Sequence, residues 1–284
     1  KLVKEVEKMN TTSGGADERL WKPEVDKTGN GYAVLRFLPA PEGEEIPWVK
    51  LYSHAFNGPG GWYIENSLTT VGKKDPVSDH NRELWNSGNE SDKDVVRRQK
   101  RKLSYYANVY VVKDPTNPQN EGGVFLYKFG KKIFDKLMEA MQPEFEDESP
   151  INPFDFWQGA NFKLKIKKKD GYWNYDSSEF DKVSPLLEDD DALEALWKKE
   201  YSLQALVAAD QFKSYDDLEK RLKYVLGQKS STRRVFDESL EDESEGRGTF
   251  TPDFKSKAPV AAPVASASQD EDDALSYFQK LAEE

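Results

Sequence analysis

The chain has 284 residues, of which 37% are hydrophobic and 33% charged, with a formal net charge of −11 and no cysteine. This size and composition predict one large domain or two small ones with tails, and they exclude disulfides and zinc–thiolate sites. No apolar run approaches the ~18 residues that a membrane helix needs. The acidity is uneven, because Phe236–Glu284 holds thirteen acidic and only four basic residues.

The first predicted elements are two strand pairs. Residues 1–18 are predicted to form a polar arm, and the core is predicted to begin at residue 19. Lys22–Pro39 is predicted to be a hairpin, because the turn sequence TGNG precedes the alternating segment GYAVLRFLP. Trp48–Phe56 and Trp62–Glu65 are predicted to pair through the turn NGPGG. Ser67–Asp94 lacks periodicity and is predicted to belong to an irregular excursion over about 67–99.

The middle of the chain alternates strands and helices. Leu103–Val112 and Val124–Phe129 are predicted strands, and Lys131–Met141 has the apolar spacing of a helix that Pro143 ends. Asn161–Lys169 alternates strictly between apolar residues and lysines, so it predicts a half-buried strand with a cationic outer face.

Helices and a tail complete the chain. Asp191–Ala209 and Ser214–Leu226 are predicted helices, the second with a near capping box at its start. Residues 230–284 are rich in Ser, Ala, Pro and acids and predict a flexible tail that ends in an amphipathic helix. Short strands followed by helices predict a mainly β, α+β fold. We expect a five-stranded OB-type barrel over residues 19–229.

The stretch Arg97–Tyr110 reads RRQKRKLSYYANVY and gives the strongest indication of function. Fixed cations beside flat rings are what a surface needs to hold an unpaired nucleic-acid strand, since the cations meet phosphates and the rings stack on bases. One face of the strand must be core, so not every tyrosine here can stack on a base. The alternative is a solvated loop leading into a core strand.

Two further patches share this composition. Lys128, Lys131 and Lys132 surround the start of a helix, where cations oppose the helix dipole and a phosphate would favour them; alternatively they are surface residues around a core Phe129. The lysine face of 161–169 leads into DGYWNYD, which carries two tyrosines and a tryptophan.

A metal or hydrolase site is the rival chemical interpretation. His54 and His80 are the only histidines, and Asp75 and Asp79 lie near them in the sequence. Their spacing matches no metal motif, and no P-loop, G-x-S-x-G or H-E-x-x-H motif is present. We therefore expect no catalysis.

Six segments in order resemble the single-stranded DNA-binding, helix-destabilising proteins of T-even-like bacteriophages. The segments are GNGYAVLRFLP (29–39), HAFNGPGGWYIE (54–65), KRKLSYYANVYVVKDP (100–115), NEGGVFLYKFGKKIFDKL (120–137), GANFKLKIKKKDGYWNYD (159–176) and FKSYDDL (212–218). The resemblance implies an OB-type core that binds single-stranded DNA without catalysis. It implies a role in replication, recombination and repair in the cytoplasm of an infected bacterium.

The residue patterns and the resemblance together give the expected DNA contacts. These residues are Arg36, Trp62, Tyr63, Trp85, Lys100, Arg101, Lys102, Tyr105, Tyr106, Tyr127, Lys128, Lys131, Lys132, Phe134, Lys163, Lys165, Lys167, Tyr172 and Tyr175.

The chain departs from the family pattern at the zinc site, which uses one His and three Cys. His54 keeps the His position, whereas Ser67, Asp75 and Ser78 stand where cysteines would be. Thiolates supply most of the affinity of such sites. We therefore expect no structural zinc and no other cofactor.

The arm and the tail bear on protein partners. The family's basic N-terminal run is missing before Leu2, so self-association along DNA is expected to be weakened. The tail is expected to compete with DNA for the basic cleft and to bind replication and recombination proteins through Asp270, Glu271, Asp272, Asp273, Leu275, Phe278 and Leu281. The alternative function is an acidic-tailed adaptor that uses the basic strip to bind an acidic protein.

Overall fold

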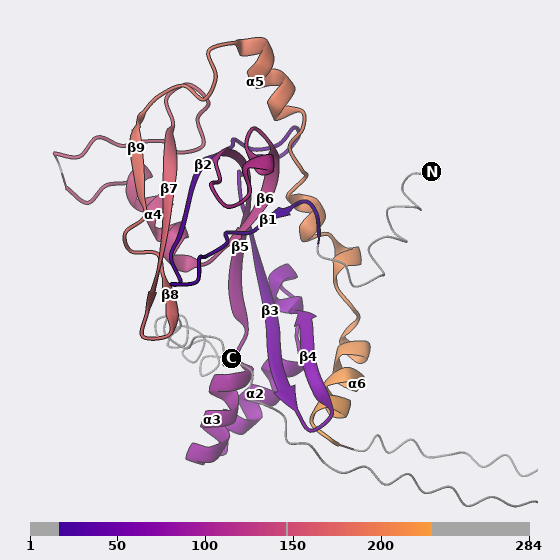
Figure 1. Ribbon diagram of the computed structural model, residues 1–284. Helices are drawn as coiled ribbons and strands as arrows, with labels where there is room; N and C mark the ends of the chain where they lie inside the picture. Colours follow the sequence, from indigo (N-terminus) through magenta and orange to yellow (C-terminus); the bar gives the residue numbers. More distant parts are fainter. Residues whose placement is uncertain (1–16, 146, 229–284) are drawn as a thin grey trace, which may run out of the picture.

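A computed structural model describes residues 17–145 and 147–228 (Figure 1). Within them the protein is α+β, with one nine-stranded sheet and five α-helices, which confirms the predicted class. The sheet is not closed. Its order is β1-β6-β5-β2-β7-β8, while β3 and β4 branch from β5, and β9 pairs with β7. The five-stranded OB-type barrel is therefore not confirmed.

The elements are bounded as follows. The strands are β1 (Leu20–Trp21), β2 (Gly31–Phe37), β3 (Val49–Gly58), β4 (Gly61–Asn66), β5 (Lys102–Lys113), β6 (Val124–Phe129), β7 (Ala160–Lys169), β8 (Tyr172–Asn174) and β9 (Glu179–Val183). The α-helices are α2 (Pro76–Asn86), α3 (Glu90–Gln99), α4 (Lys131–Met141), α5 (Asp190–Trp197) and α6 (Tyr215–Val225). None of the described helices is both long and apolar enough to cross a membrane.

Strand β5 joins two bodies of the molecule. Its first half pairs with β3 and its second half with β2, while β6 pairs along its other edge. In Figure 1, β3, β4, α2, α3 and α6 gather at one end, and β2, β7, β8, β9 and α4 lie at the other. We call the first group the small lobe and the second the main body.

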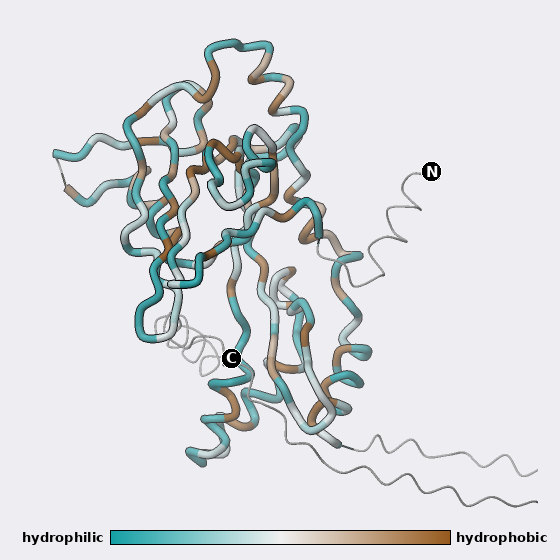
Figure 2. Tube along the Cα trace, viewed as in Figure 1, coloured by the Kyte–Doolittle hydropathy of each residue, from teal (hydrophilic) through white to brown (hydrophobic). Residues whose placement is uncertain are grey.

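The main core lies on one face of β5. Tyr105, Ala107, Val109 and Val111 alternate along the strand and are all buried, as a pleated strand with one core face requires. They pack with residues of β2, β6 and β7 and with α4. Figure 2 shows hydrophobic positions along these strands and hydrophilic ones over the connecting loops.

The segment predicted to be irregular, about 67–99, is instead mostly helical. Residues 68–71 form a 3-10 turn, and helices α2 and α3 follow. The helix start is encoded by Asp75 and Pro76: the Asp75 side chain accepts hydrogen bonds from the amides of Val77 and Ser78, and a proline at the first helical position is favourable. The helices are short and strongly charged, which hides their periodicity.

Two other boundaries differ from the sequence expectation. Lys22–Asp26 forms no strand, although the turn is present, because the Asp26 carboxylate accepts the amides of Thr28 and Asn30. The helix predicted over Asp191–Ala209 ends at Trp197, because residue Tyr201 exchanges two hydrogen bonds with the side chain of Asn108 on β5. Within the described residues, the other predicted strands and helices match their elements within a few residues, and the predicted helix at the end of the tail lies outside them.

Candidate nucleic-acid interface

One face of β3 carries a row of cationic and aromatic side chains. Lys50 and Tyr52 alternate along the strand and therefore share a face, and Trp48 directly precedes it. The antiparallel register places Lys50 opposite Tyr105 and Tyr52 opposite Leu103 on β5. Across the sheet, this face of β3 therefore continues onto the face of β5 that carries the buried Tyr105.

Helix α4 adds a ring to this row. Ile133 and Leu137 are buried and fix the helix against the main core. The neighbouring Phe134 stacks on Tyr105, with ring centroids 4.0 Å apart and planes 9° apart. Its ring also lies 5.5 Å from that of Trp48. The aromatic surface is thus held by packing before any ligand arrives.

Two cations lie over these rings. The Arg101 guanidinium is 4.1 Å from the centre of the Tyr52 ring, and the Lys50 ammonium is 5.9 Å from both the Tyr105 and the Phe134 rings. Lys50 is exposed and forms no ion pair among the described residues. We call the set Trp48, Lys50, Tyr52, Arg101 and Phe134 the β3 track; the buried Tyr105 supports it from the core.

A second, smaller group lies on the reverse face of β5. Lys128 lies 5.8 Å over the Tyr106 ring. Although Lys128 as a residue is exposed, desolvation of its ammonium group, followed by repulsion from Lys22 and Lys102, lowers its pKa. Burial likewise raises the pKa of Tyr106. An anion bound here would relieve the repulsion among the three lysines.

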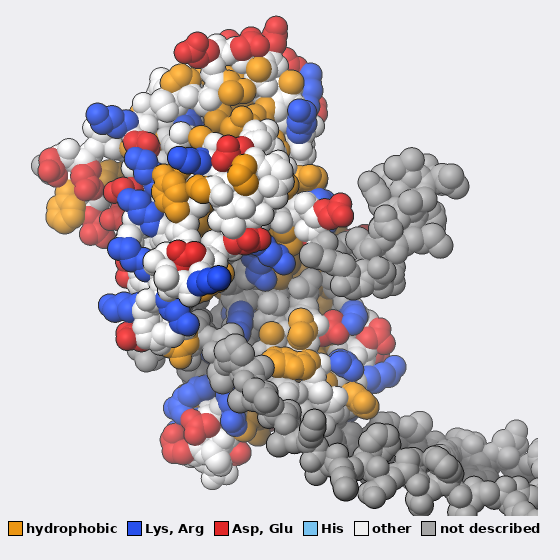
Figure 3. All heavy atoms as spheres, in the orientation of Figure 1, with side chains coloured by type: hydrophobic (Ala, Val, Ile, Leu, Met, Phe, Trp, Pro, Cys, Tyr) orange, Lys and Arg blue, Asp and Glu red, His pale blue; other side chains and the backbone are white. Residues whose placement is uncertain are grey.

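The lysines of β7 are largely neutralised by β9. Lys163 pairs with Asp181 at 2.9 Å and Lys165 with Glu179 at 2.6 Å. Lys167 lies further along the strand, is exposed, and faces Asn174 of β8. Figure 3 shows basic side chains along this β7–β8 edge and acidic ones over α5. Tyr172 lies in the same hairpin, opposite Lys169.

The lysines at the start of α4 have acidic partners rather than a free position for phosphate. Lys131 pairs with Asp135 at 2.9 Å, and Lys132 approaches Asp176 at 3.7 Å. Lys136 also donates to the Asp176 carbonyl. These contacts tie α4 to the segment after β8, where Tyr175 packs partly buried against the main core.

The structure corrects four expected DNA contacts. Arg36 and Tyr63 are 0% exposed, Tyr127 is 2% and Tyr105 is 4% exposed, and Phe129 and Phe134 both stack on Tyr105, so no ligand reaches these four side chains. Arg36 instead donates to the carbonyl oxygens of Asp155 and Ser184. Tyr63 stacks on Phe56 in the small lobe. Residues 33–38 are buried on both faces, which a single arginine in an apolar run does not reveal.

Other expected contacts lie apart from the track. Trp62 is 56% exposed on the outer face of β4, and its carbonyl accepts a hydrogen bond from Arg221. Trp85 lies in α2 beneath the ammonium of Lys93. The basic strip is divided: Arg97 belongs to α3 and pairs with Asp94, whereas Lys100 and Arg101 follow the helix and lead into β5. Lys102 opens β5 on the same face as Tyr106.

Sequence reasoning missed three residues of the track, Trp48, Lys50 and Tyr52. The sequence predicts the strand but gives no role to this face of it. The alternation in WVKLYSHAF already separates Trp48, Lys50, Tyr52 from Val49 and Leu51, and the latter two are buried. What the sequence does not give is the partner of this face, which is α4.

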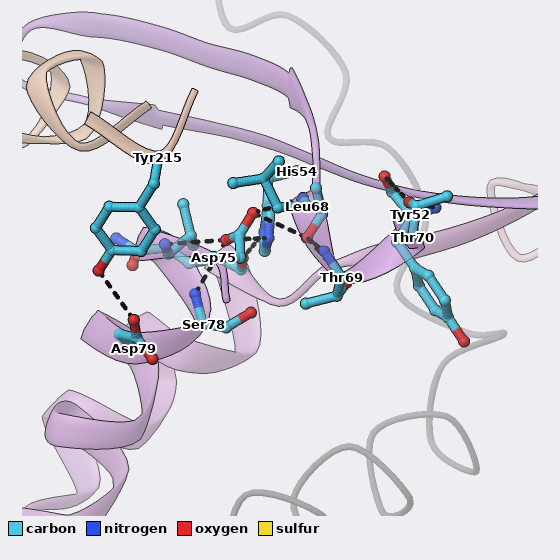
Figure 4. Close-up of polar contacts among 12 residues, drawn as sticks. Tyr52, His54, Leu68, Thr69, Thr70, Asp75, Ser78, Asp79 and Tyr215 are labelled. Atoms are coloured by element: carbon cyan, nitrogen blue, oxygen red, sulfur yellow. Dashed lines mark hydrogen bonds and ion pairs between the residues drawn. The ribbon is translucent and has the colours of Figure 1, made fainter. Parts of the chain in front are cut away.

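The small lobe is organised around the buried carboxylate of Asp75 (Figure 4). Its Oδ2 accepts hydrogen bonds from the Ser67 hydroxyl and the Leu68 amide, both at 3.0 Å. Its Oδ1 lies 3.3 Å from Nε2 of His54, whose Nδ1 donates to the carbonyl of Gln99. The cluster therefore links β3, the 3-10 turn, α2 and the end of α3.

The environment keeps Asp75 charged. Burial opposes its ionisation, but the hydrogen bond and charge of His54, together with the Leu68 and Ser67 bonds, outweigh it and lower the pKa of Asp75. Among the described residues, no group of three or more His, Asp or Glu side chains is arranged to hold a metal ion.

The chain is similar to known proteins over most of its length. A family model described as gp32 DNA binding protein like matches residues 29–226. Single-stranded DNA-binding proteins of Enterobacteria phages T2 and T4 are each 39% identical, over 236 and 235 residues, which is 80% of this chain and 77% of each relative. A single-stranded DNA-binding protein of Enterobacteria phage RB70 is 38% identical over 112 residues, covering 37% of this chain and 92% of the relative.

Proposed function

This chain belongs to the gp32-like family of DNA-binding proteins, and we propose that its β3 track is the surface on which single-stranded DNA lies. The protein binds single-stranded DNA and is not an enzyme. The observation that supports the location is the position of Lys50 near the Phe134 ring, at 5.9 Å, and of Arg101 near the Tyr52 ring, at 4.1 Å. There, a phosphate can meet a cation while its base lies on the adjacent ring.

The mechanism follows from the chemistry of these groups. Every base has a flat face, so stacking contributes ~1–3 kcal/mol per base without reading sequence. Cations that meet phosphates release counterions, so affinity falls with salt. Because the site accepts only an unpaired strand, binding shifts the duplex equilibrium toward melting by mass action and needs no ATP.

The remaining surface residues take supporting roles in this proposal. Lys100, Lys102, Lys128 and Lys167 extend the positive potential around the track. Lys163 and Lys165 must give up their ion pairs with β9 carboxylates before they can bind phosphates, so each contributes less to the free energy of DNA binding. Tyr106, Tyr172, Tyr175, Trp62 and Trp85 are additional stacking candidates. The open sheet is proposed to be a divergent OB-type core.

The biological setting is proposed from the phage relatives. The protein would coat and protect unpaired DNA during phage replication, recombination and repair in the infected host cell. The predicted partner-binding tail and N-terminal arm lie outside the described residues. The alternative of an acidic-partner adaptor is not favoured, and competition between oligo-dT and such a partner separates the two.

The test compares matched lysine variants. Lys50→Ala should weaken binding of a fluorescent oligo-dT and reduce the slope of log affinity against log salt by about 0.7. Lys198→Ala, whose lysine pairs with Glu194 on the distant α5, should change neither. Duplex DNA of the same sequence should bind far more weakly. Equal binding by the two variants across salt would refute the track as the interface.

We also propose that hydrogen bonds replace the family's zinc in the small lobe. The donor set of His54, Asp75 and two serine hydroxyls does not suit a structural zinc site, which relies on thiolates. Both oxygens of Asp75 are already engaged by backbone amides and side chains. The same elements that a metal would join are joined here by one carboxylate.

A further inference from the structure

A pocket opens at the Trp48 end of the β3 track. It has a volume of about 340 Å³, and its walls include Trp48, Phe154, Phe156 and Trp157. Trp48 belongs to both features, because its ring lies 5.5 Å from Phe134 of the track and 5.4 Å from Phe154 of the pocket. A strand lying on the track would therefore reach the mouth of the pocket.

Another lining residue, Trp157, is an exposed ring that is nevertheless held in place. Trp157 is 55% exposed, yet its indole nitrogen donates to Asp190 of α5 at 3.0 Å and its amide donates to Asp155 at 2.8 Å. A ring fixed in this way suits ligand binding, because the side chain loses little conformational entropy when a ligand stacks on it.

The buried Arg36 fixes the backbone behind this ring. Its guanidinium donates to the carbonyls of Asp155 and Phe156 at 3.0 and 3.4 Å, and to that of Ser184 at 2.7 Å. A Cβ at Gly159 would lie 2.2 Å from the Asp155 carbonyl, so the turn is also tightly packed. Arg36 thus positions the pocket wall rather than contacting DNA itself.

The lining selects a base over a phosphate. No lysine or arginine is among its lining residues, whereas Glu45 and Asp155 are. Oδ1 of Asp155 accepts two backbone amides, and Oδ2 accepts no hydrogen bond among the described residues. Carboxylates repel phosphate but accept hydrogen bonds from the exocyclic amine of cytosine, whereas thymine offers an acceptor and a methyl group at the equivalent position.

We propose that this pocket is a subsite for one unpaired base of the bound strand, and that it prefers a base carrying an exocyclic amine. The proposal rests on the proposed function, since the strand is delivered by the track. It gives an otherwise sequence-tolerant surface one position at which base identity matters.

The experiment measures affinity for oligo-dC and oligo-dT of equal length, at mildly alkaline pH so that cytosine stays unprotonated. Trp157→Ala should lose at least about fivefold in affinity for oligo-dC, the equivalent of one stacking contact. The loss for oligo-dT should be smaller. Tyr224→Ala, which removes a similarly exposed ring from α6, should alter neither affinity.

The outcomes separate the two proposals. If Trp157→Ala binds both oligonucleotides like the parent protein while Lys50→Ala is weakened on both, the pocket is not a base subsite and the track stands. Equal losses on dC and dT overturn the amine preference. If neither substitution matters, both the track and the pocket are wrong.

Discussion

A single carboxylate, that of Asp75, links β3, the 3-10 turn and α2 beside the buried apolar cluster of the small lobe. It accepts hydrogen bonds from the 3-10 turn and from the start of α2 and faces His54 on β3. Asp75→Asn leaves the imidazole without its charged partner in a buried site. We expect the free energy of unfolding to fall by about 3 kcal/mol or more. Chemical denaturation measures this, with Asp216→Asn on the exposed first turn of α6 as a control that should have little effect.

The same residue predicts a pH dependence. The folded-state pKa of Asp75 lies below its ordinary value of 3.8, so the unfolded chain binds the proton more readily. Its contribution to stability is complete above that value and is lost as the pH falls through the lower folded-state pKa. Asp75→Asn should therefore show a flatter decline in acid than the parent protein. Identical acid profiles would contradict the role given to this carboxylate.

Glu200 should have the opposite effect. Its two carboxylate oxygens are buried without partners among the described residues, and burial, followed by repulsion from Glu44, raises its pKa to about 8. The folded protein then holds the proton more tightly than the unfolded chain, so stability falls as the pH rises from the ordinary value of 4.5 toward 8. Glu200→Gln should gain about 1 kcal/mol or more at the upper end of this range and little in acid. Thermal melts of both proteins across pH test the difference.

Residue roles were predictable from the sequence only in part. The alternation of β5 correctly implied that some of its tyrosines are core, and Tyr105 is indeed largely buried. Arg36 could not be assigned correctly, because its partners are carbonyl oxygens more than a hundred residues away. Such long-range hydrogen bonds leave no periodic signal in the chain.

At the scale of elements, the turn between β3 and β4 packs tightly on the end of α6. Gly60 donates its amide to the Val225 carbonyl at 2.8 Å, and a Cβ at Gly60 would lie 2.1 Å from the Tyr224 carbonyl oxygen. Gly60→Ala should therefore push the hairpin and helix apart and cost about 1–3 kcal/mol. Hydrogen exchange should speed up in β3, β4 and α6 while β7 keeps its protection. Uniform protection in the variant would show that the turn adapts.

Elements with strong local signals were predicted well, and those set by tertiary contacts were not. Helix α4 has clear apolar spacing and matches its prediction residue for residue. Residues 198–209 do not continue α5. The Asn108 side chain forms hydrogen bonds with the backbone of Tyr201. The Glu44 carboxylate accepts hydrogen bonds from the amides of Leu203 and Gln204. The helical pattern there was real, but contacts with β5 and its neighbours replaced the helix.

At the scale of the whole molecule, strand β5 connects the main body and the small lobe. β5 contributes to the main core, and its pairing with β3 supports both the β3 track and the small lobe. Binding and lobe stability should therefore be coupled. The α+β class was accessible from the strand and helix patterns, whereas the open sheet was not, since strand closure depends on pairings between distant segments.

Removing metal ions tests the proposal that hydrogen bonds replace zinc in the small lobe. If hydrogen bonds replace zinc, prolonged dialysis against a chelator should leave both the melting temperature and oligo-dT affinity unchanged, and metal analysis should find no stoichiometric zinc. The residues at the centre of the lobe offer a carboxylate and hydroxyls rather than thiolates. A large drop in melting temperature after chelation would overturn the replacement.

The Asp75 cluster also has a consequence for what the small lobe needs in order to fold. If hydrogen bonds replace zinc, as proposed, the small lobe folds with no demand on the trace-element supply of the cell. Because the chain has no cysteine, peroxides and hypochlorite have no sulfhydryl to attack. Sulfhydryl oxidation, which would disrupt a zinc–thiolate site, therefore has no target in this lobe.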